Sequence, residues 1–102
     1  MAGYKIHVQA FALQDIQEAT DWYNEQAKGL GSRFQKQAKQ QIDALKKNPF
    51  AYAIRYADVR CMLVKKFPFM IHFSIDEKQK LVEVFAIYHT SGNPKKWMER
   101  KK

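Results

Sequence analysis

The residues best suited to chemistry lie in the second half of the chain, where cations and histidines stand among apolar residues of strand-like segments. If the basic strand follows the same alternation as the others, one face of the sheet carries five polar side chains: Arg60, Lys66, His72, Glu83 and His89. A guanidinium binds phosphate with two hydrogen bonds, and histidine transfers protons near neutrality. Such a set would suffice for RNA cleavage through the 2′-hydroxyl without a metal.

The same residues also have a structural interpretation. Lys, Arg and His are common on half-exposed sheet faces because they meet water, and a histidine between two large apolar residues, such as His72, is often structural. His89 is the second catalytic candidate, because it ends a strand beside a loop. The candidate phosphate- or target-binding residues are Arg60, Lys65 and Lys66.

Length and charge limit the possible functions. The 102 residues suit a single domain, 1–102, and carry a formal net charge of +8. Residues 1–50 hold seven Lys/Arg against five Asp/Glu, whereas residues 51–102 hold eleven against five. The second half is therefore expected to face a polyanion or an acidic partner, although a basic protein without such a partner is the plain alternative.

The sequence predicts no metal or cofactor. Its single cysteine, Cys61, excludes an internal disulfide and a thiolate zinc cluster, and a buried structural role is expected for it. No glycine-rich phosphate loop is present. No signal peptide and no apolar run long enough to span a bilayer are visible, so we expect a cytoplasmic protein without membrane contact.

Hydrophobic periodicity predicts a strand, two helices and three further strands. Residues 4–9 alternate as a strand, an amphipathic helix covers about Ala12–Ala27, and a second apolar stripe runs from Leu30 to Leu45. The very short glycine turn between the helices implies an antiparallel helical hairpin. We expect an α+β domain of order β-α-α-β-β-β, with the hairpin on one face of a mainly antiparallel four-stranded sheet.

Several details follow from this arrangement. Phe69, Ile71, Phe73 and Ile75 are expected to face the helices, and the first strand to pair with the last. A basic tail, residues 93–102, has Trp97 as its one anchor.

Two adjacent aromatics on the first helix, Trp22 and Tyr23, point about 100° apart. Either both pack on the sheet, or one lines a groove and serves a partner. Trp22, Tyr23 and Trp97 are the candidate partner-binding residues.

In their order and spacing, several motifs resemble the RelE/ParE superfamily, the toxins of type II toxin–antitoxin (plasmid stabilisation) systems, and its ParE-like branch in particular. The motifs are Ala19-Thr20-Asp21-Trp22-Tyr23, Gly29-Leu30-Gly31-Ser32-Arg33-Phe34, Asn48-Pro49, Val59-Arg60, Phe67-Pro68-Phe69-Met70-Ile71-His72-Phe73, His89 and Pro94-Lys95-Lys96-Trp97.

The resemblance implies the same β-α-α-β-β-β fold and an acidic antitoxin that folds onto the toxin in a hetero-oligomer. It also implies one of two targets: DNA gyrase, which ParE-like members inhibit by binding, or mRNA on the ribosome, which RelE-like members cleave. The chain departs from the nuclease pattern, since Met70 stands where RelE-like toxins carry an arginine. The gyrase-binding toxin is therefore our first hypothesis, with the ribosome-dependent endoribonuclease as its alternative. A member that has lost toxicity and remains a binding module is the third.

Overall fold

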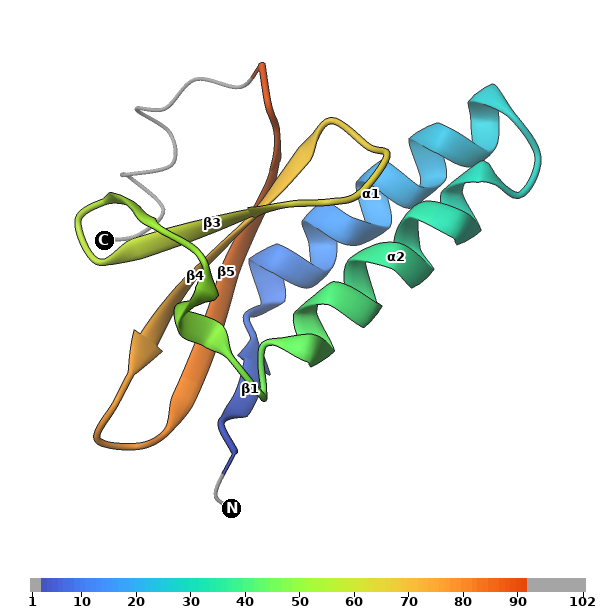
Figure 1. Ribbon diagram of the computed structural model, residues 1–102. Helices are drawn as coiled ribbons and strands as arrows, with labels where there is room; N and C mark the ends of the chain where they lie inside the picture. Colours follow the sequence, from blue (N-terminus) through green and yellow to red (C-terminus); the bar gives the residue numbers. More distant parts are fainter. Residues whose placement is uncertain (1–2, 92–102) are drawn as a thin grey trace.

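The computed structural model describes residues 3–91, which form two helices, a short 3-10 turn and five strands (Figure 1). The predicted tail, 93–102, and its anchor Trp97 lie outside the described residues. The elements are β1 (Lys5–Val8), α1 (Ala10–Gln26), α2 (Leu30–Ala44), η1 (Pro49–Ala51), β2 (Ile54–Tyr56), β3 (Val59–Leu63), β4 (Phe69–Asp76) and β5 (Leu81–His89).

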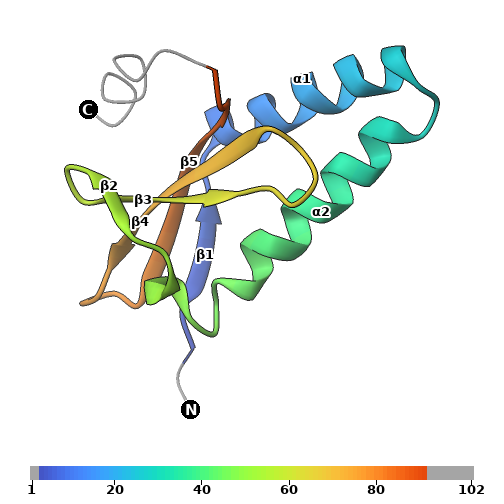
Figure 2. The same cartoon turned by 45° about the horizontal axis from the view of Figure 1, so that its top comes forward.

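The strands form one sheet in the order β1-β5-β4-β3-β2, with the helical hairpin packed on one face (Figure 2). β1 pairs in parallel with β5, while the other neighbours pair antiparallel. The α+β class and the pairing of the first strand with the last are confirmed. The sheet has five strands rather than four, because Ile54–Tyr56, for which no strand was predicted, pairs with β3 as an edge strand. Three largely exposed residues carry too little alternation to be recognised.

The helical hairpin depends on two glycines at its turn. Gly29 has a φ of 83°, a left-handed conformation that glycine adopts without strain. Gly31 brings α2 so close to α1 that an added Cβ would collide with the Thr20 carbonyl oxygen. The helix α1 begins at Ala10, two residues earlier than predicted, and Gln9 before it makes no side-chain cap.

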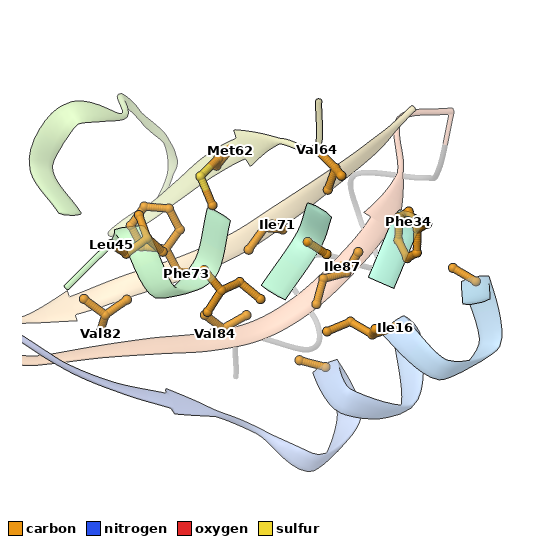
Figure 3. Close-up of a cluster of buried hydrophobic side chains, with 14 of the residues drawn as sticks. Ile16, Phe34, Leu45, Met62, Val64, Ile71, Phe73, Val82, Val84 and Ile87 are labelled. Atoms are coloured by element: carbon orange, nitrogen blue, oxygen red, sulfur yellow. The ribbon is translucent and has the colours of Figure 1, made fainter. Parts of the chain in front are cut away.

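The main core lies between the hairpin and the sheet (Figure 3). The predicted inward residues of β4 are confirmed, since Ile71 and Phe73 are fully buried there and Phe69 and Ile75 pack against them. Burying such side chains contributes roughly 1.5–3 kcal/mol each. This core fixes the position of both helices over the sheet.

A bulge in β5 changes which side chains share a face. Phe73 pairs with Val84, but the preceding His72 pairs with Ala86, so Phe85 is an extra residue on β5. Side chains after Phe85 therefore switch faces relative to simple alternation. The prediction that Glu83 and His89 share a face is wrong for this reason.

Candidate functional site

His72 lies on the sheet face opposite the helices but is fully buried. It belongs to a small second cluster there, with Cys61, Phe85 and Tyr88 around it. The Nδ1 atom of His72 is 3.0 Å from the Tyr56 hydroxyl and 3.4 Å from the Cys61 thiol. This histidine is packed and hydrogen-bonded in the manner of a core residue.

The two groups beside His72 are held in their neutral forms. Burial raises the pKa of the Cys61 thiol to about 11, although the Arg55 guanidinium acts in the opposite direction. Burial, with smaller repulsion from Cys61, Tyr88 and Asp58, raises the pKa of the Tyr56 hydroxyl well above its usual value. A protonated thiol is a poor nucleophile, which matches the structural role expected for Cys61.

Arg60 does not join His72, and its predicted place on that face is wrong. It pairs with Phe73 across β3 and β4, which puts its side chain on the helix side at the edge of the sheet. There the guanidinium donates a 2.6 Å hydrogen bond to the Tyr52 carbonyl oxygen and lies 5.2 Å from the centre of the Phe50 ring. These contacts attach the η1–β2 segment to β3.

Glu83 is also engaged elsewhere. Its carboxylate lies 3.1 Å from Nδ1 of His7 on the neighbouring strand β1. The five residues predicted for one face are therefore distributed over several places.

His89 is exposed and lies on the helix side, because the bulge reverses its direction. Its ring packs edge-on against Phe69, and its Nδ1 accepts the Ser91 backbone N–H at 3.1 Å. The neutral imidazole then carries its proton on Nε2 and offers a donor. A groove of about 460 Å³ beside it is also lined by Asp15 and Glu18 of α1. The Nε2–H of His89 could donate a hydrogen bond there, but His72 and Arg60 do not reach this groove.

Lys65 and Lys66 lie in the loop between β3 and β4, and Lys66 does not project from the sheet as predicted. The loop turns sharply, with a φ of 71° at Lys66. Both lysines line a groove of about 450 Å³ together with Arg33 and Lys36 of α2. These two α2 cations were not predicted as site residues, because their helical spacing is that of an ordinary solvated face. We call this groove, whose lining includes Arg33, Lys36, Lys65, Lys66 and Phe67, the basic groove.

The two adjacent aromatics of α1 take different positions, so the interpretation that both pack on the sheet is wrong. Tyr23 is buried and contacts Phe34, Phe67 and Phe69. Trp22 leaves 54% of its surface exposed while its ring meets Tyr23 edge-on. A partner role for Trp22 stays a prediction, and Tyr23 belongs to the core.

A second groove, of about 240 Å³, lies on the other side of α2 and is mainly apolar. We call it the apolar groove; it is lined by Ile6, Val8, Leu13, Ile16, Lys39, Ile42, Asp43 and Lys46. Leu13 is 52% exposed there. β1 borders it and is an edge strand of the sheet.

Residues 3–91 contain no group of three or more His, Cys, Asp or Glu side chains placed to hold a metal ion. Within the same part of the chain, no helix combines the length and apolar character needed to cross a membrane.

The fold is that of known toxins. The chain resembles a structure of a chromosomal ParDE toxin–antitoxin system from P. aeruginosa, with a TM-score of 0.77 and 15% identity over 89% of this chain and all of that one. An intact RelBE toxin–antitoxin complex from E. coli matches with a TM-score of 0.66 and 15% identity over 88% of this chain and 99% of that one. The RelBE2 toxin–antitoxin complex from Mycobacterium tuberculosis matches with a TM-score of 0.64 and 14% identity over 90% of this chain and 97% of that one.

The family follows from the sequence itself. Residues 5–94 match the family described as "ParE toxin of type II toxin-antitoxin system, parDE". The chain therefore belongs to this family of toxins. No curated protein matches it in sequence.

Proposed function

We propose that this toxin arrests growth by binding DNA gyrase in the cytoplasm, without catalysis of its own, and that an acidic antitoxin neutralises it. The observation that carries this proposal is the dispersal of the candidate nuclease set. His72 is buried, Arg60 is bound to the Tyr52 carbonyl, and His89 lies on the other side of the sheet from His72. General acid–base cleavage needs these groups around one phosphate.

The apolar groove is the surface that suits the antitoxin. Apolar side chains line it, and the outer backbone edge of β1 can accept a further strand. The net charge of +8 favours rapid association with an acidic partner. In the RelBE and ParDE structures named above, the toxin belongs to a toxin–antitoxin system.

The decisive experiment follows DNA and protein synthesis by pulse-labelling within minutes of inducing this chain without antitoxin. We expect DNA synthesis to fall first. Purified protein should also inhibit supercoiling by gyrase while leaving mRNA on ribosomes intact. A fall in protein synthesis before DNA synthesis would contradict the proposal.

His89→Gln separates the proposal from the ribonuclease alternative. The alternative has one observation in its favour, since His89 is exposed beside a groove with Asp15 and Glu18. A gyrase-binding toxin keeps its toxicity in this variant, whereas a ribonuclease loses its mRNA cleavage. Circular dichroism and melting temperature should be unchanged, because the His89 side chain is exposed.

A further inference from the structure

We infer that the basic groove binds the phosphate backbone of a single-stranded nucleic acid. This goes beyond the proposed function, because neither gyrase binding nor antitoxin binding needs such a site. Four cations converge from two elements: Arg33 and Lys36 from α2, and Lys65 and Lys66 from the β3–β4 loop. No carboxylate lines the groove.

The charge of the groove is local. A different groove, beside the β4–β5 hairpin at the other end of β4, is lined by four carboxylates and one lysine: Asp58, Asp76, Glu77, Glu83 and Lys78. The two ends of β4 therefore carry opposite charge, and a polyanion would be directed to the α2 side.

The loop is held rigidly beside the helix by one glutamine. The Gln41 side-chain amide donates a 2.8 Å hydrogen bond to the Leu63 carbonyl oxygen, and its oxygen accepts the Lys65 backbone N–H at 2.8 Å. Gln37 donates a further 2.8 Å bond to the same Gln41 oxygen. The loop cations are thus positioned next to those of α2 before any ligand arrives, which reduces the entropy lost on binding.

The remaining lining suits nucleotides better than a peptide. Gln37 and Gln40 supply amides, and the half-buried ring of Phe67 offers an aromatic surface on which a base can stack. A peptide would need an open strand edge or a row of apolar anchors. β3 pairs with β4 on one edge and with β2 at Val59 and Arg60 on the other, and the apolar lining of the groove consists of Leu30 and Phe67.

The test measures fluorescence anisotropy of labelled oligo-dT and oligo-U of about 16 nucleotides. Four phosphate contacts predict an affinity loss of about 50-fold when salt rises from about 50 to about 200 mM. Lys36→Gln with Lys65→Gln should reduce that loss to about 7-fold. The control, Lys47→Gln with Lys78→Gln, removes the same charge elsewhere and should keep the 50-fold loss.

Further binding measurements determine which kind of ligand the groove prefers. Phe67→Leu should weaken binding of the single strand about 5-fold or more. A duplex of the same length should bind more weakly than either oligonucleotide. Three results would each overturn the inference: a salt-dependent loss that falls to about 7-fold in the control double variant as well, tighter binding of the duplex, or binding of an acidic peptide with none of the oligonucleotides. Melting temperatures establish that every variant is folded.

Discussion

The two grooves that flank α2 differ in almost every property, although they share one helix. On one side of the buried stripe of α2, Ile42 and the residues of β1 and α1 form an apolar surface. On the other side, Arg33 and Lys36 meet the two loop lysines and form a cationic surface. A single amphipathic helix therefore presents a core stripe and two unlike flanks, and each flank takes its character from the element beside it.

This difference separates two kinds of recognition. Apolar surface and an edge strand give affinity through burial and backbone pairing, which salt hardly affects. Clustered cations give affinity that falls steeply with salt. We therefore expect the two grooves to bind independently, and the following changes test that expectation from the largest effect to the smallest.

Gly31→Ala should disturb both grooves together. The new Cβ would collide with the Thr20 carbonyl oxygen and the Asn24 side chain, so α2 must move away from α1. We expect a loss of about 3 kcal/mol in the free energy of unfolding, measured by urea denaturation. Gly3→Ala is the control, since its Cβ would be only slightly crowded by the Lys46 carbonyl oxygen. A Gly31→Ala variant as stable as wild type would show that the helices are not tightly coupled.

Leu13→Gln should weaken the apolar groove alone. Removing this half-exposed side chain from a docked antitoxin costs about 2 kcal/mol, roughly a 30-fold loss of affinity by isothermal titration calorimetry. Binding of oligonucleotides should not change. The reciprocal test is the double variant Lys36→Gln with Lys65→Gln, which should keep its affinity for the antitoxin. If both variants weaken both ligands, the grooves are not independent.

Gln41→Leu should loosen the basic groove and leave the apolar one intact. It removes the partners of the Leu63 carbonyl and the Lys65 N–H, at a cost of about 1 kcal/mol in stability. Hydrogen exchange at the Lys65 amide should accelerate, with weaker oligonucleotide binding. Gln17→Leu, which removes a pair with Asp21 on exposed α1, is the control and should leave this amide protected. Unchanged exchange in Gln41→Leu would refute the positioning role.

The rate at which a thiol reagent labels Cys61 should not change when a ligand binds in either groove. Cys61 lies on the sheet face away from the helices and is buried, and its pKa of about 11 keeps the thiol protonated at pH 8. Labelling by a thiol reagent should be slow with and without either ligand. Raising the pH from about 9 towards 11 should destabilise the fold, because the unfolded chain ionises this thiol first. Faster labelling on binding would mean that the sheet also moves.

Periodicity was sufficient to predict the elements that bury a stripe or a face. The helices, β1 and β4 have strong alternation or helical spacing, and the packing of Phe73 and Ile71 toward the hairpin followed from it. β2 was missed because its three residues are mostly exposed and its pairing depends on the contact of Arg60 with the segment before it.

The candidate site was harder to predict because it depends on which face each strand presents. Met62 and Val64 share the parity of Arg60, and their burial in the main core places that set on the helix side. Cys61 and Leu63, on the opposite side, are also apolar, so the sequence does not distinguish the faces. The basic groove joins residues far apart in the chain, and hydrogen bonds of Gln41 that no local pattern reveals hold its loop.

The extra residue at Phe85 has a consequence for how this sheet can change over generations. Loss of that single codon would restore regular pairing and leave His89 opposite Phe69 on the helix side, because the register on both flanks of the bulge stays the same. One in-frame deletion could therefore remove the bulge while every other side chain of β5 keeps its face of the sheet. Aligning such strands residue by residue, without a gap at the bulge, would compare side chains that never occupy the same place.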